Sequence, residues 1–156
     1  MADLLSDGMI RVEWLTTCAN IAAPTVAERN AGLNLTPVMT PDGLKTDASN
    51  ANVDNSSLAS TYDTTLVGRV KNANSVKFKK QDAADTAATT LTFKANGFLL
   101  VRRNVATGTA PAIGDKCEVY PSQCGVQNPG FGPNTIQTIE ISLENSAQPN
   151  LLAVTA

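Results

Sequence analysis

The hydrophobic pattern is most continuous in residues 97–103 (GFLLVRR), near the centre of the chain. Apolar side chains fall on both faces of an extended segment here, where Phe98 and Leu100 alternate with Leu99 and Val101. A strand with one wet face alternates between apolar and polar residues, so this strand is expected to be covered on both sides.

The following segment, residues 114–121, does alternate. Cys117 and Val119 lie on one expected face, and polar or polar-tipped residues lie on the other. A loop of small residues that ends at Pro111 and Gly114 joins the two segments. The pattern therefore predicts a buried strand beside a half-solvated one at the centre of a sheet.

Strands are also expected before and after this centre. Residues 9–15 alternate, with Ile10, Val12 and Trp14 predicted to face inward and Arg11 and Glu13 outward. Residues 135–143 place Ile139, Ile141 and Leu143 on one face, and residues 151–156 form a short final strand. Residues 33–40 read as a strand that Pro37 interrupts or confines to a sheet edge. Residues 125–133 read as a loop rich in Gly and Pro.

Two short helices are expected. In residues 21–32 the Thr25 side chain can cap the helix while Glu28 reaches back, which is a capping box, and Gly32 suits a left-handed residue after the helix. In residues 81–91, Asp82 is the expected N-cap and Asp85 suits the positive helix end. This second helix is predicted to cover one face of the central strand. The mixture predicts an α+β domain, mainly antiparallel β, over residues 1–156.

A hairpin is predicted from residues 64–71 and 74–80, turning at Asn72 and Ala73. Val76 and Phe78 face one side, and lysines alternate with them. Five of the twelve basic residues fall within twelve positions of this hairpin, with no acid among them. The net charge of the whole chain is −2, so the remaining residues carry a net charge of −7. The basic residues are Arg69, Lys71, Lys77, Lys79 and Lys80. They are either a solvated strand face that resists edge pairing or a surface that binds an acidic partner.

Residues 41–62 contain few apolar side chains and are long for a connection in a compact domain. They form either a mobile surface loop or an ordered arm that binds another subunit. Within residues 42–63 four acids accompany a single lysine. These charged residues are Asp42, Lys45, Asp47, Asp54 and Asp63.

Composition argues against catalysis. The chain has no histidine, which excludes Ser-His and Cys-His nucleophiles, and it has no nucleotide-binding motif or zinc-ligand spacing. No cofactor or metal and no enzymatic activity are expected. The net charge of −2 argues against a nucleic-acid binder held by bulk charge, and no apolar run approaches the length of a membrane span. The three cysteines are expected to be buried thiols.

Four runs of sequence resemble the major tail tube protein of long-tailed, non-contractile (siphovirus-type) phages, most closely those of actinobacteria. The runs are IAAPTVAERNAGLNLTPVMTPDGL (21–44), VDNSSLASTYDTTLVGR (53–69), GFLLVRR (97–103) and GDKCEVYPSQCG (114–125). The resemblance covers most of the chain, in the same order.

This resemblance implies two packed antiparallel sheets with a flanking helix. It also implies self-assembly into sixfold rings that share an inner β-barrel and stack head to tail. The expected partners are other copies of the chain, the tape-measure protein and the tail tip and terminator proteins. DNA would pass through without specific binding. The protein would reside in the virion tail after assembly in the host cytoplasm.

Two surface roles are expected on this basis. The acidic arm is expected to meet the basic strand of a neighbouring subunit and so help to set the stacking register. A wall that does not bind phosphate is best for DNA passage, so acidic and polar faces are expected to line the bore. The lining candidates are Glu118, Glu140, Ser142 and Glu144.

Other classes of function stay open at this point. The alternatives are another virion assembly protein, such as a capsid decoration protein or a tail terminator, and a β-sandwich module that binds carbohydrate or protein. The low aromatic content of 4% counts against carbohydrate recognition, which usually needs exposed aromatic platforms.

Overall fold

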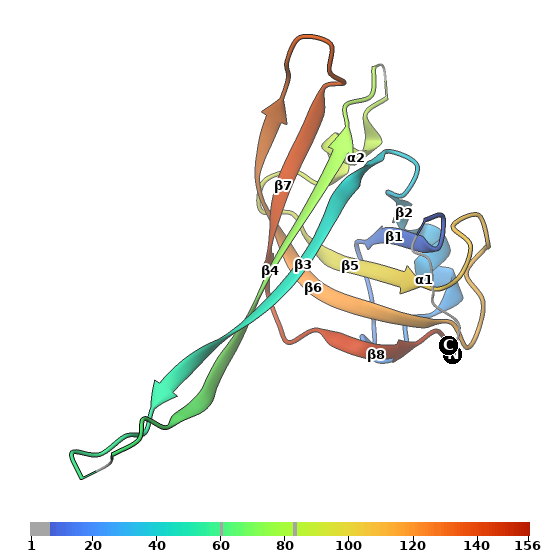
Figure 1. The fold of residues 1–156 in the computed structure, drawn as a ribbon. Coiled ribbons are helices and arrows are strands. Elements are labelled where there is room, and N and C mark those ends of the chain that lie inside the picture. The colour runs from blue at the N-terminus through green and yellow to red at the C-terminus, as the bar shows by residue number, and fades with distance from the viewer. Residues whose placement is uncertain (1–6, 60, 83) are drawn as a thin grey trace.

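The fold is one antiparallel sheet of eight strands with two short helices (Figure 1). The computed structural model describes residues 7–59, 61–82 and 84–156. The strands are β1 (Ile10–Leu15), β2 (Leu33–Asn34), β3 (Met39–Asp54), β4 (Thr65–Lys79), β5 (Asn96–Arg103), β6 (Lys116–Gly130), β7 (Thr138–Asn145) and β8 (Asn150–Val154), and the helices are α1 (Val26–Ala31) and α2 (Thr86–Thr90). The mainly β, antiparallel class expected from the sequence is confirmed.

The strand β6 belongs to two layers of this sheet. Its first half pairs with β5 and β8, and its second half pairs with β7, with a register shift between Cys124 and Gln127. A bulge at such a shift bends a strand and increases its twist. The two layers are therefore two ends of one sheet that share β6. The predicted loop at residues 125–133 was wrong in its first part, because β6 continues to Gly130.

The sheet curls until its ends approach each other. The strand order is β2-β1-β5-β6-β7-β4-β3, with β8 beside β6. The turn before β3 bonds to both ends: the Leu35 amide donates to the Val12 carbonyl of β1 at 2.9 Å, and the Lys79 amide of β4 donates to the Val38 carbonyl at 2.7 Å. The predicted interruption near Pro37 is this turn, and it gives the body a barrel-like form.

The central strand β5 is covered on both faces, as its pattern predicts. Leu99 and Val101 belong to the main core with Trp14, Phe78 and Leu91, the C-cap residue of α2. Leu100 belongs to a second, smaller core on the other face, which also contains Cys117 and Val119 of β6. Burial of each large apolar side chain stabilises the fold by about 1.5–3 kcal/mol.

The first helix begins as predicted. Thr25 caps α1, and the bonds between Thr25 and Glu28 complete the capping box. The expected left-handed Gly32 was wrong, because its φ is −71° and the chain runs directly into β2. Glycine fits there because the backbone passes close to β1: an added Cβ would lie 3.0 Å from the Trp14 carbonyl oxygen and 3.3 Å from Leu15 Cγ.

The second helix is shorter than expected, and it starts later. Asp85 rather than Asp82 is the N-cap of α2, and its carboxylate accepts the Ala88 amide. Residue 83 of the predicted helix lies outside the described residues. Ala87 and Leu91 are buried in the main core, so α2 covers the predicted face of the sheet.

The chain between residues 39 and 79 forms one long hairpin. The predicted turn at Asn72 and Ala73 was wrong: β4 continues through both residues, which pair with Ala48 and Asp47 of β3. Residues 41–54 of the arm predicted at residues 41–62 therefore lie in β3, and the remainder follows the end of that strand, with residue 60 outside the described part. Figure 1 shows this hairpin extending far beyond the rest of the fold.

Candidate assembly surfaces

The far part of the β3–β4 hairpin extends past the rest of the fold (Figure 1). We call residues 48–54 and 65–71 the overhang, and most of its described side chains are exposed. A two-stranded ribbon in water is only marginally stable by itself. The overhang and the tip beyond it nevertheless carry exposed apolar side chains. They are Val53, Leu58, Tyr62, Leu66, Val67 and Val70. A monomer leaves this apolar surface in water, which marks it as a contact surface.

The acidic arm and the basic strand expected from the sequence are the two strands of this hairpin. They pair with each other in one chain: Lys45 is opposite Ser75, and Asp47 is opposite Ala73. Lys77 Nζ lies 3.9 Å from the Asp42 carboxylate, within the same chain. Lys45 Nζ lies 4.0 Å from Glu140 of β7. Exposed pairs of this kind contribute about 0–1 kcal/mol each, so the hydrogen-bonded ladder, and not charge, holds the strands together.

Register also places the lysines of β4 on the same sheet face as the acids of β7. Lys77 is opposite Glu140, and Lys79 is opposite Thr138. Ser142 and Glu144 follow on this face by alternation. The sequence assigned the lysines and the acids to separate surfaces, whereas in the sheet the two strands are neighbours and carry them on one face.

This face, which we call the polar face, has balanced charge. Its acids and bases alternate over β3, β4 and β7, with serines and threonines between them. Within residues 42–47, 71–79 and 138–144, four acids accompany four bases: Asp42, Asp47, Glu140 and Glu144 with Lys45, Lys71, Lys77 and Lys79. The pKa of Asp42 is lower than its usual value. The causes are a hydrogen bond from the Thr40 hydroxyl, one from the Asp42 amide, and the positive charge of Lys77 nearby.

Glu118 lies apart from the other lining candidates. It is on β6 opposite Val101 and therefore on the side of the sheet that carries the main core, near its rim. Its carboxylate accepts from Arg103 at 2.8 Å and from the Tyr120 hydroxyl at 2.9 Å. Burial, with the bond that its hydroxyl donates, raises the pKa of Tyr120 to about 12. Glu118 is thus part of a local network and does not share the polar face.

The remaining charged candidates are exposed. Asp54 ends β3, and its carboxylate accepts the Ser56 amide at 2.8 Å, a bond that lowers the pKa of Asp54. Asp63, Arg69 and Lys80 are exposed on the hairpin or at its ends. None of these four forms an ion pair within 4.0 Å with another of the described residues.

A buried charge network that sequence reasoning missed lies under the opposite layer. Glu13, predicted to face solvent, is 1% exposed and accepts from Arg29 Nε of α1 at 2.9 Å. Arg29 also donates to Asp115, which accepts at 2.9 Å from Arg102. Arg102 reaches three carbonyl oxygens of the loop before β6. The network joins β1, α1, β5 and that loop, and its role is structural.

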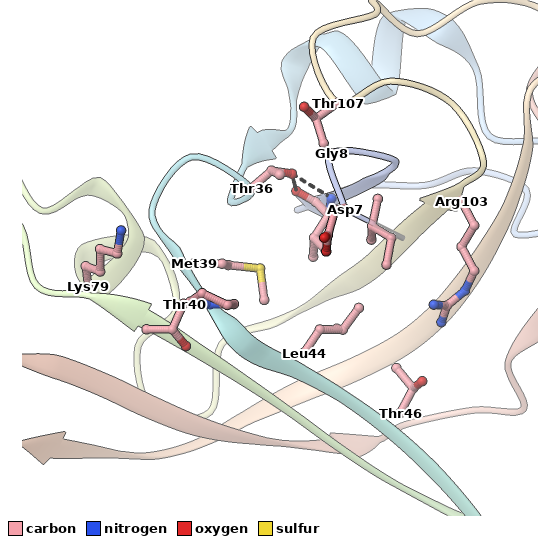
Figure 2. A pocket seen from close by; sticks show the side chains of 13 residues that line it. Asp7, Gly8, Thr36, Met39, Thr40, Leu44, Thr46, Lys79, Arg103 and Thr107 are labelled. Carbon is pink, nitrogen blue, oxygen red and sulfur yellow. Dashed lines mark hydrogen bonds between the residues drawn. The ribbon is translucent and has the colours of Figure 1, made fainter. Parts of the chain in front are cut away.

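A cavity of about 500 Å³ lies at the seam where the ends of the sheet approach. Ile10, Met39 and Leu44 form an apolar lining, while Figure 2 shows Lys79 and Arg103 at opposite ends of it. Within the described residues, no three His, Cys, Asp or Glu side chains gather in a way that could hold a metal ion. The cavity therefore offers apolar volume but no convergent set of reactive groups.

The layer β6-β7-β4-β3 has two sheet edges that pair with no other described strand. One is the outer edge of β3. The other is the second half of β6, residues 125–130, because β5 pairs with β6 only as far as Gln123. Unpaired edges of this length are templates for pairing with another chain.

Among the described residues, no helix is long and apolar enough to cross a membrane. All three cysteines are free; Cys117 and Cys124 are buried, and Cys18 is half-buried. Burial raises the pKa of the Cys124 thiol to about 11.

Comparison with known proteins bears on these surfaces. No curated protein matches the chain. A solved structure with a similar fold is the cryo-EM structure of the anti-feeding prophage baseplate, 6-fold symmetrised, with a TM-score of 0.60 and 8% sequence identity over 98% of this chain and 98% of that chain. At this identity the likeness concerns the fold. The sequence profile described as "Phage tail tube protein" matches residues 1–156. The chain therefore belongs to the phage tail tube protein family.

Proposed function

We propose that copies of this chain join side by side into rings and that the rings stack into the tail tube of a phage. The observation that carries this proposal is the pair of free edges on the layer β6-β7-β4-β3. The layer has an even number of alternating strands, so under cyclic symmetry β3 of one copy runs antiparallel to β6 of the next. Closure of such a ring removes both edges.

Lateral growth in this way also gives the polar face a role. The core, α2 and the other layer pack on the opposite side of the β6-β7-β4-β3 layer. If that opposite side faced the ring axis, these elements would fill the bore. The polar face is therefore the side of the layer that would face the axis. Glu140, Ser142 and Glu144 would line the channel together with Lys77 and Lys79. Balanced charge would keep phosphate attraction weak and let DNA pass without specific binding.

The finer features of the proposal follow the sequence resemblance. The tail would be long and non-contractile, of a phage related to those of actinobacteria, with sixfold rings around the tape-measure protein and tip and terminator proteins at its ends. The sixfold symmetrisation reported for the structurally similar baseplate supports that ring number. The overhang, uncovered in one chain, would reach a neighbouring subunit and bury its apolar side chains there.

Negative-stain microscopy and light scattering of the purified chain, as a function of concentration, test this function. Rings or hollow filaments are expected, and class averages of end views give the subunit number. A monodisperse monomer at high concentration, with protected β3 amides in hydrogen exchange, would contradict the proposal.

A further inference from the structure

A groove of about 770 Å³ lies at the root of the overhang. One wall is β4, and the other is the connection between β7 and β8 together with the start of β8. Its apolar lining comes from both walls, with Val70 on one side and Ala147, Pro149 and Leu151 on the other. Arg69 and Glu144 stand among the polar residues of the lining.

The apolar part of this groove continues the core side of the sheet, while Lys71 and Glu144 line it from the polar face. Along β4, Val70 alternates in phase with the core residues Val76 and Phe78, which are fully buried. The body ends before Val70, so its side chain is 69% exposed, and Leu151 across the groove is 56% exposed. The sheet therefore presents a core-like surface that the described residues of its own chain leave exposed.

The turn between β6 and β7 is at the other end of the molecule. Figure 1 places it at the end of the long axis opposite the hairpin tip. Phe131 and Ile136 in this turn are 83% and 65% exposed. The sequence from 129 to 138 (PGFGPNTIQT) contains no charged residue. An exposed aromatic on an uncharged turn has the composition of an interface core, where charged residues are depleted.

We infer that the β6–β7 turn of one copy docks into the groove of the next copy along the tube axis. The inference rests on the proposed function and names the axial contact within it. The two surfaces lie at opposite ends of the long axis, so stacking copies in one direction brings each turn to a groove. The contact is heterologous and does not close, which is the type of interface that extends a filament. The turn itself brings no charged group into the contact, and Phe131 is the anchor that meets the apolar part of the groove.

Cross-linking of tubes tests the contact directly. The doubly substituted chain Phe131→Cys, Val70→Cys is made with Cys18→Ser, because the other two native thiols are buried. Mild oxidation should give a ladder of covalent dimers, trimers and longer species on a non-reducing denaturing gel. Each single substitution should give no ladder. The matched control pairs Phe131→Cys with Ile113→Cys, which is 80% exposed and outside the groove, and it should give no ladder either.

A second measurement uses the tube itself. The variant Phe131→Ser, Ile136→Ser should still form single rings but should shorten the tubes at least tenfold, whereas Ile113→Ser should not. Hollow tubes without the ladder, or tubes of normal length from the Phe131 and Ile136 variant, would overturn the axial contact and leave the tube function standing. A parent chain that forms neither rings nor tubes would overturn both.

Discussion

Arg29 donates a hydrogen bond from Nη1 to Oδ2 of Asp115, 3.2 Å away, across 86 residues of sequence. The guanidinium is buried, and through Nε and Nη1 it also bonds Glu13 and the Thr155 hydroxyl. One side chain of α1 thus joins the first strand, the loop before β6 and the C-terminal segment.

Replacement of Arg29 should therefore be costly. In Arg29→Met the buried Glu13 carboxylate loses a partner, and removal of one member of a buried pair costs about 3–5 kcal/mol. Urea unfolding of the chain measures the change in free energy of unfolding. Arg69→Met, at an exposed position of the hairpin, is the control and should change it by about 0.5 kcal/mol or less. Equal effects of the two substitutions would contradict a structural role for the network.

Acid should weaken the same network. Burial by itself raises the pKa of Asp115, but the Ala112 amide and the guanidinium groups of Arg102 and Arg29 outweigh it and hold the pKa below 3.8. A lowered carboxylate pKa contributes stability that is present above the unfolded value and is lost as the pH falls through the folded value. The wild type should thus lose its advantage over Asp115→Asn below about pH 4. Unfolding midpoints that remain parallel from pH 7 to pH 2 would contradict this prediction.

A single methyl group at Gly97 should disrupt the central packing. A Cβ there would lie 2.5 Å from the indole of Trp14 and 2.7 Å from the Leu15 carbonyl oxygen. Gly97→Ala should lower the free energy of unfolding by about 1–3 kcal/mol or more, because the backbone of β1 must move. Gly108→Ala is the matched control, since no atom lies within 4 Å of its added Cβ. Thermal unfolding of both variants checks the difference.

The charge balance of the polar face gives a functional prediction. The variant Glu140→Gln, Glu144→Gln leaves the lysines of that face in excess, so tubes should retain DNA. The log–log salt dependence of binding should steepen by about one for each lysine that becomes available to phosphate. Glu118→Gln, on the other side of the sheet, is the control and should leave DNA passage unchanged. DNA retention that is equal in both variants would show that the polar face does not line the bore.

The alternation of apolar and polar residues predicted the strands well where one face of the strand is buried and the other is exposed. Val76 and Phe78 alternate with lysines, and both are in the core as expected. Asn72 and Ala73 suggested a turn only because polar residues interrupt the apolar pattern. Those residues lie near the start of the overhang. Neither face of the ribbon is buried in the overhang, so its side chains need not alternate between apolar and polar.

Charge was harder to place than hydrophobicity. Glu13 alternates as an outward residue of β1, yet a helix packs over that position and supplies Arg29 as its partner. The polar face combines strands that are distant in sequence, so the lysines of β4 and the acids of β7 could be joined only once the strand order was known. Pairings of this range depend on topology, which alternation does not contain.

The continuity of β6 has a mechanical consequence. One unbroken backbone runs through both layers, bonded to β5 and β8 in one and to β7 in the other. Shear between the layers would have to tear several hydrogen bonds at once, so each copy should respond to bending as a stiff unit. A tube built from such copies would curve at the joints between them, and its flexural rigidity would report on those joints.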